Sequence, residues 1–134
     1  MKRALILSVL VLAGCQLPPE RLPVRPLPEA TEPLPYAELL TRARLQATSA
    51  TEAFFVDQWA DLDDYARGLE QTARFMQKSV EVPEPRKKTL EADTKELKDM
   101  ADQLREAAKA KNVDKTNALL QRIQLKVREM RLAD

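Results

Sequence analysis

The side chains that most often do chemistry in proteins are scarce in this sequence. The 134 residues include one cysteine, Cys15, and no histidine. Histidine is the commonest general base and metal ligand, and a lone cysteine cannot form an internal disulfide. The hydroxyls of Ser49 and Ser79 therefore lack the histidine that would activate them as nucleophiles. We expect no catalytic residues, no metal site and no cofactor, so the chain is predicted not to be an enzyme.

Cys15 stands at the end of a distinctive N-terminal pattern. Met1-Lys2-Arg3 is a short basic start, and residues 4–13 are apolar apart from Ser8. That stretch is too short to span a bilayer, but it has the length of the apolar region of a signal peptide. It ends in Leu12-Ala13-Gly14-Cys15, a branched apolar residue and two small residues before the cysteine. This tetrad resembles the lipobox of bacterial lipoproteins.

The lipobox implies an address for the chain. Residues 1–14 would be the signal peptide, with Leu12, Ala13 and Gly14 recognised by the signal peptidase. Cys15 would carry diacylglycerol on its thiol and a further acyl chain, such as palmitate, on its new amino group, and several chains together anchor a protein stably. Gln16 rather than Asp follows the cysteine, which in enterobacterial lipoproteins favours the outer over the inner membrane. The alternative is an ordinary signal peptide in which Cys15 stands by chance.

Residues 15–35 are predicted to form an extended tether behind the lipidated cysteine. Seven of the nine prolines lie between residues 16 and 35, and proline disfavours both helix and sheet. At about 3.1 Å per residue, this solvated segment would hold a folded domain up to roughly 60 Å from the membrane. Pro23-Val24-Arg25-Pro26 also fits the P-x-x-P pattern, so a proline-rich recognition motif is the alternative.

Residues 36–134 carry the helical spacing that must position any site. Apolar residues recur at steps of three and four, as in helices with one buried face. The runs are Tyr36–Phe54, Trp59–Val80, Leu90–Ala108 and Val113–Met130. Their similar lengths and short connections predict an all-α domain, an antiparallel up-down-up-down four-helix bundle over 36–134. A pair of tetratricopeptide-like hairpins is the alternative, although such repeats usually need three units.

Several residues are candidates for the helix boundaries. Asp57 is predicted to be the N-cap of the second helix. Asn112 suits a left-handed position at the end of the third helix, and Asp114 suits the N-cap of the fourth. Pro83 and Pro85 fit the first turn of the third helix, where backbone N–H groups have no helical partner.

The C-terminal part of the chain carries a second likeness. The stretch from Leu104 to Leu120, with the ending Arg128-Glu129-Met130-Arg131, resembles the last hairpin of the cytochrome c-prime family, which are periplasmic four-helix bundles. The last helix of that family carries Cys-x-x-Cys-His followed by an aromatic residue and arginine. Here the same place reads Ile123-Gln124-Leu125-Lys126-Val127, and only Arg131 remains. The resemblance implies the bundle fold and argues against c-type haem.

Haem bound without covalent attachment is the alternative function that this resemblance leaves. Such a cytochrome-like protein, related to electron transfer, would need methionine ligands from Met76, Met100 or Met130. Met76 and Met130 stand in the apolar runs, and methionine is a common filler of irregular cores. We therefore expect core packing rather than haem ligation.

Two charged groups invite a binding interpretation. Asp57, Asp61 and Asp64 share a helix face and carry oxygen ligands for Ca²⁺ or Mg²⁺, but acidic residues are also favoured at a helix N-terminus. The basic end of the last helix, which could meet anionic lipid or an acidic partner, is expected mainly to complement the helix dipole. Its members are Arg122, Lys126, Arg128 and Arg131.

The charge balance limits the partners. There are 22 basic and 21 acidic residues, and removal of residues 1–14 with Lys2 and Arg3 leaves 20 and 21. Nucleic-acid binding usually needs a concentrated basic face, so none is expected. We predict a membrane-anchored, periplasm-facing cell-envelope lipoprotein with a structural or protein-binding role. Its oligomeric state is open, because regular heptads also permit dimerisation as a coiled coil.

Overall fold

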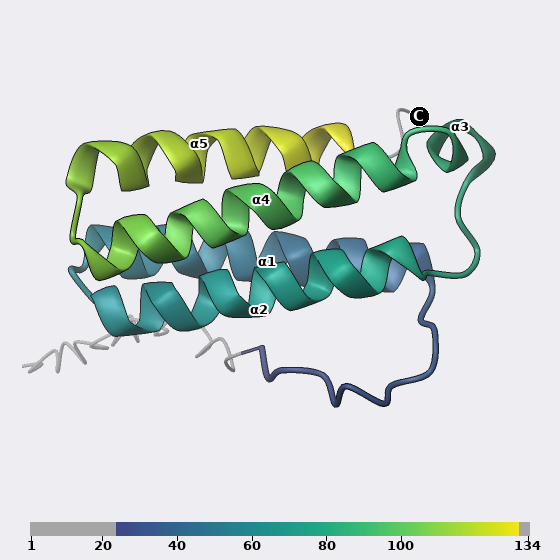
Figure 1. Ribbon diagram of the computed structural model, residues 1–134, viewed down its shortest axis with the longest axis horizontal. Helices are drawn as coiled ribbons and strands as arrows, with labels where there is room; N and C mark the ends of the chain where they lie inside the picture. The colour runs from purple at the N-terminus through teal and green to yellow at the C-terminus, as the bar shows by residue number, and fades with distance from the viewer. Residues whose placement is uncertain (1–23, 132–134) are drawn as a thin grey trace, which may run out of the picture.

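The computed structural model describes residues 24–131, and the lipobox Leu12–Cys15 lies outside the described residues. Within them the chain is all-helical, as predicted. The long helices lie side by side, with a short helix in the connection between the second and third of them (Figure 1). The helices are α1 Tyr36–Phe55, α2 Trp59–Gln77, α3 Glu84–Lys87, α4 Leu90–Lys109 and α5 Val113–Glu129. In the described part of the chain, no helix is long and apolar enough to cross a membrane.

The long helices contact one another in a closed ring. Helix α1 packs on α2, α2 on α4, α4 on α5, and α5 returns to α1. The α2–α4 contact is the most extensive of the four, and the α1–α5 contact is the smallest. The surface between α1 and α5 is therefore the least closed part of the ring.

The core combines a helix of small side chains with helices of large ones. Ala43, Ala47, Ala50 and Ala53 of α1 are buried. Large aliphatic side chains from α2, α4 and α5 fill the space that these alanines leave, as close-packed interiors require. Those with no exposed surface are Leu62, Leu69, Leu97, Leu104 and Ile123. The three candidate haem ligands Met76, Met100 and Met130 lie in the same core, at 0%, 2% and 0% exposure.

The predicted apolar runs agree with the buried faces except near their ends. In α1 the buried positions include Leu39 and Ala53, whereas the predicted Leu40 and Phe54 only pack at the edge of the core. Val80 and Val113, the outermost members of their runs, are exposed. Other end members, such as Tyr36 and Met130, are buried.

The turns use different residues from those predicted. Asp57 is not the N-cap of α2, which is Gln58. Asp57 has φ 58° and ends α1 in the left-handed conformation. Its N–H donates to the Phe54 carbonyl, and the Gln58 N–H donates to the Ala53 carbonyl. These two bonds are the pattern of a Schellman motif.

The turn between α4 and α5 repeats this arrangement. Lys111, with φ 48°, takes the left-handed position predicted for Asn112. Asn112 is instead the N-cap of α5 in place of Asp114, and its Oδ1 accepts from the Lys115 N–H at 3.0 Å. Both predicted caps were therefore wrong by one or two positions, although the turns themselves lie where expected.

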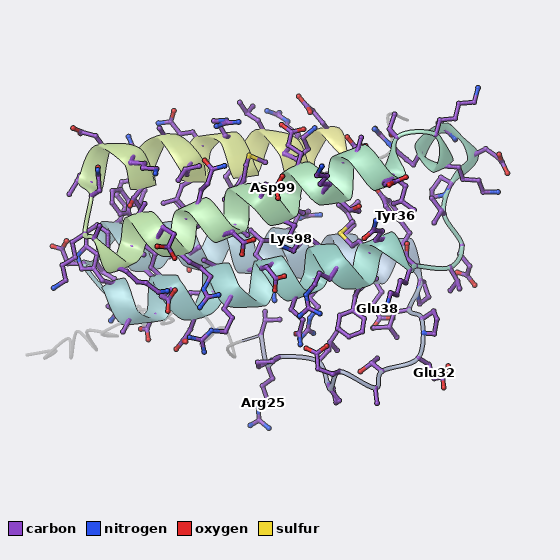
Figure 2. The ribbon with its side chains drawn as sticks, in the orientation of Figure 1. Arg25, Glu32, Tyr36, Glu38, Lys98 and Asp99 are labelled. Carbon is purple, nitrogen blue, oxygen red and sulfur yellow. The ribbon has the colours of Figure 1, made fainter. Side chains whose placement is uncertain are left out.

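One end of the ring is joined by contacts between segments far apart in the sequence. The Tyr36 hydroxyl donates to the Met130 carbonyl at 2.7 Å, and Tyr36 is 2% exposed; Figure 2 labels it at the start of α1. Burial raises the pKa of this phenol. Beside it, Arg86 of α3 donates to the Arg131 carbonyl at 2.6 Å. The start of α1 and the end of α5 are thus fixed together at this end.

Candidate functional site

Ion pairs cover the side of the ring that includes α4. Asp63 of α2 accepts from Arg105 of α4 at 3.2 Å, and Glu70 of α2 lies 3.8 Å from Lys98 of α4. These pairs are partly exposed, so each contributes little to stability. Their effect on binding is larger, because charges already paired within the chain are less available to a partner.

Lys126, one of the four residues of the predicted basic end, belongs to this paired surface. Its Nζ lies 2.6 Å from Glu96, 3.3 Å from Asp93 and 3.4 Å from Glu129. The hydrogen bond to Glu96 raises the pKa of Lys126 most, and Asp93 adds to the effect. With its side chain 13% exposed, Lys126 connects α5 to α4 rather than facing a partner.

The opposite side, between α1 and α5, carries a groove without acidic residues. Two hollows of about 390 and 250 Å³ both include Gln124 and Leu125 in their linings, so they lie next to each other along α5. None of the residues that line it is Asp or Glu. We call this surface the α1/α5 groove; its defining side chains are Arg44, Thr51, Phe55, Gln124, Leu125, Arg128 and Arg131.

The α1/α5 groove has an apolar end and a basic end. Phe55 and Leu125 are 74% and 57% exposed, which is high for large apolar side chains. Arg44, Arg128 and Arg131 line the other hollow. None of these three arginines forms an ion pair with another residue of the described 24–131. Exposed apolar side chains next to unpaired cations are typical of a protein-binding surface.

Half of the predicted basic end therefore faces this groove. Arg128 and Arg131 line it, whereas Lys126 is paired with α4. The sequence did not indicate Arg44, Phe55 or Leu125, because their role depends on which two helices become neighbours. The weak signal available was Leu125, a large apolar residue outside the buried run of its helix.

The aspartate face at the start of α2 does not form a metal site in the structure. Asp57 lies in the turn before α2, and Asp61 and Asp64 are exposed. In the region 24–131, no group of three or more His, Cys, Asp or Glu side chains is placed to hold a metal ion.

The proline-rich segment differs from the predicted solvated tether from residue 24 onward. Figure 1 shows this part of the chain running beside α2 before it enters α1. The side-chain amide of Gln71 accepts from the Leu27 N–H at 2.9 Å and donates to the Leu27 carbonyl at 2.8 Å. Leu27 and Leu34 pack against the core. Two leucines and one matching glutamine thus attach an extended segment that sequence periodicity does not mark.

Glu29 adds an ion pair to this attachment. Its carboxylate accepts from Arg74 at 3.3 Å and from the Gln71 amide at 3.2 Å, and the Arg74 hydrogen bond is the main cause that lowers the pKa of Glu29. Because the pKa of Glu29 is lowered in the folded state, the ion pair contributes to folding stability above the usual titration range of a glutamate. It is lost as the pH falls through the lowered pKa. Both side chains are largely exposed, so the pair is weak.

We expect Gln71→Ala to detach the segment around Leu27 while leaving the helices folded. The change removes both backbone bonds to Leu27 and the bond to Glu29. At about 1 kcal/mol per bond, amide hydrogen exchange at Leu27 should become at least about tenfold faster. Gln103→Ala is the matched control, since Gln103 is exposed on α4. Unchanged exchange at Leu27 in the Gln71 variant would contradict the attachment.

Comparison with known proteins adds no family to this description: no family model, no curated protein and no solved structure matches the chain.

Proposed function

We propose that the protein is a cell-envelope lipoprotein, anchored to a membrane through Cys15, that binds another protein along the α1/α5 groove and catalyses no reaction. The observation that carries the binding role is the groove itself, which exposes Phe55 and Leu125 beside three arginines that have no described ion-pair partner. The anchoring role is supported by the lipobox Leu12-Ala13-Gly14-Cys15. The chain offers no histidine for general base catalysis.

We further propose that the helices form an antiparallel up-down-up-down four-helix bundle. Supporting this topology, each long helix contacts its neighbours in sequence, and α5 closes the ring on α1. The connections between α1 and α2 and between α4 and α5 are three residues each, which favours antiparallel neighbours. In this topology Phe55 lies near the start of α5 and Arg44 near its end, in agreement with the two groove linings.

The proposed partner is an acidic amphipathic helix of another envelope protein. From Asn117 to Arg128 the groove follows about 16 Å of α5, the length of roughly three helical turns. Carboxylates at one end of the partner would face Arg44, Arg128 and Arg131, and apolar side chains at the other would cover Phe55 and Leu125. Helix-in-groove recognition of this kind uses apolar anchors for affinity and charges for orientation.

The attached segment sets how far this groove can extend from the membrane. With residues 24–35 held on the helices, the distance to the proposed anchor at Cys15 is limited by the length of residues 15–23. Nine extended residues span about 28 Å at 3.1 Å each, against roughly 60 Å for the whole solvated segment. The proposed partner therefore presents its helix within a few tens of ångströms of the same membrane.

Site-specific photo-crosslinking in cells tests the groove. We expect a photoreactive benzoylphenylalanine at position 125 to give a discrete crosslinked product, and one at exposed Gln103 on α4, outside the groove, to give none. Arg128→Glu should reduce that product about tenfold, since it places a carboxylate opposite those of the partner. Arg122→Glu is the matched control. It makes the same change of charge on α5, but Arg122 does not line the groove.

Two results would contradict the proposed function. Equal products from positions 103 and 125 would mean that the groove has no special affinity. A product with twice the mass of the chain would identify a second copy as the occupant, and the groove would then be a dimer interface rather than a site for another protein.

A further inference from the structure

A separate hollow, outside the α1/α5 groove, lies on the other side of α1, under the attached segment. It has a volume of about 490 Å³, within the usual range of small-molecule sites. The segment forms one wall with Val24, Pro26 and Glu29, and α2 forms the other with Tyr65 and Gly68. Gln46 of α1 also lines it. The cavity exists because the segment is held on α2 by Gln71, so it is a product of tertiary structure.

Gln46 brings an unsatisfied donor to this cavity. The residue is 1% exposed, and its Oε1 accepts from the Thr72 hydroxyl at 2.7 Å. Its Nε2 is buried and has no hydrogen-bond partner. A buried amide N–H without an acceptor costs about 1–3 kcal/mol, so native proteins usually provide one. Because Gln46 lines the cavity, a ligand bound there could supply this acceptor.

Gly68 explains how the amide reaches the cavity. A glycine inside a helix such as α2 costs about 1 kcal/mol relative to alanine. A Cβ at position 68 would lie 2.8 Å from Nε2 of Gln46, closer than carbon and nitrogen atoms normally approach. The absence of that carbon gives the Gln46 amide its place between α1 and α2. Gly68 and Gln46 therefore form the floor of the cavity together.

The charges around the cavity favour an uncharged ligand. Its lining includes three arginines and four carboxylates. Arg67 and Arg74 are already paired with acidic residues, and Figure 2 shows the Arg25 side chain projecting away from the helices. Arg25 also lines the cavity, but the four carboxylates outnumber the three arginines, so the lining does not favour an anionic ligand. The neutral Gln46 amide can donate to a carbonyl oxygen. The walls of Val24, Pro26 and Tyr65 suit an apolar body.

We propose that this cavity binds an uncharged, partly apolar small molecule whose carbonyl oxygen accepts a hydrogen bond from Nε2 of Gln46. This site is independent of the α1/α5 groove and of the proposed protein partner. A bound ligand would contact both the attached segment and α2, so it would also strengthen the attachment of residues 24–29.

The experiment compares benzamide with benzylamine, a ligand of similar size that lacks the carbonyl oxygen and is a cation at neutral pH. Benzamide is titrated to about 10 mM into the complete ¹⁵N-labelled chain, a range suited to a ligand of nine heavy atoms. We expect saturable shifts of the Gln46 side-chain NH₂ signals with benzamide and none with benzylamine. Gln46→Leu should weaken benzamide binding about tenfold, as for one lost hydrogen bond. Gln103→Leu, at an exposed position of α4, should leave binding unchanged.

Gly68→Ala provides a second test that keeps Gln46 in place. The added methyl group displaces the amide from the floor, so benzamide affinity should fall while the helical circular dichroism stays the same. If benzamide leaves the Gln46 signals unchanged up to 10 mM, the cavity holds water only. If benzylamine binds as well as benzamide, an acidic rim residue such as Asp61 governs binding. Either result would overturn the proposal.

Discussion

Leu97→Ala is expected to lower the free energy of unfolding by about 2–5 kcal/mol, the range measured for buried leucines that leave a cavity. Leu97 lies on α4 with no exposed surface, in the helix that makes the most extensive contact of the ring with α2. The alanines of α1 cannot expand to fill the vacated space, because their side chains are a single methyl group. Domains of this size have total stabilities of about 5–15 kcal/mol, so the variant should be close to unfolding.

Leu125→Ala makes the same chemical change at the surface and serves as the control. Leu125 is 57% exposed on α5, so its loss should change stability by less than about 0.5 kcal/mol. Urea unfolding, followed by far-ultraviolet circular dichroism, measures the stability of both variants. If the unfolding free energy falls with urea at the same slope in both, unfolding exposes the same amount of surface in both. Equal losses from the two substitutions would mean that α4 and α5 are not packed as described. Leu125→Ala also separates binding from folding, because it should weaken the partner complex without destabilising the chain.

The helices were predictable from the sequence because their signal is local. A buried face repeats every three or four residues, and a run such as Leu90 to Ala108 shows it without reference to any other helix. The buried positions of α4 agree with that run. The boundaries were less predictable, because a Schellman turn depends on backbone geometry that many residue types can adopt. Lys111 takes the left-handed position, although its neighbour Asn112 has the stronger intrinsic preference.

The surfaces with functional potential were not predictable, because each one needs partners distant in sequence. Leu27 and Gln71 are 44 positions apart and meet only when the proline-rich segment turns back along α2. Thr51 and Gln124, which hydrogen-bond across the α1/α5 groove at 3.3 Å, are 73 positions apart. Gln46 stands in a helix interior like many exposed glutamines, and only the packing of α1 against α2 buries it. Apolar periodicity finds cores, and it carries no information about polar contacts between helices.

Cys15→Ser is expected to abolish the proposed lipid attachment completely, which makes it the largest effect predicted for any single substitution in this chain. Cys15 is the chain's one thiol, and a serine hydroxyl does not form the thioether that carries diacylglycerol. Each acyl CH₂ contributes roughly 0.8 kcal/mol to membrane binding, so loss of several chains removes the anchor. The measurement is metabolic labelling with an alkyne analogue of palmitate, combined with the electrophoretic mobility of the protein. The variant should carry no label and should keep residues 1–14, because cleavage follows lipidation.

Labelling is a sharper measure than membrane fractionation alone, since the uncleaved apolar stretch 4–13 can itself hold the precursor at the membrane. Gln16→Ala is the matched control: it lies directly after the lipobox and should leave both label and mobility unchanged. A Cys15→Ser protein that still incorporates label would show that the acyl chains attach elsewhere. A wild-type protein that is cleaved but carries no label would identify an ordinary signal peptide. The α1/α5 groove would then belong to a protein released from the membrane, and its distance from the bilayer would no longer restrict the choice of partner.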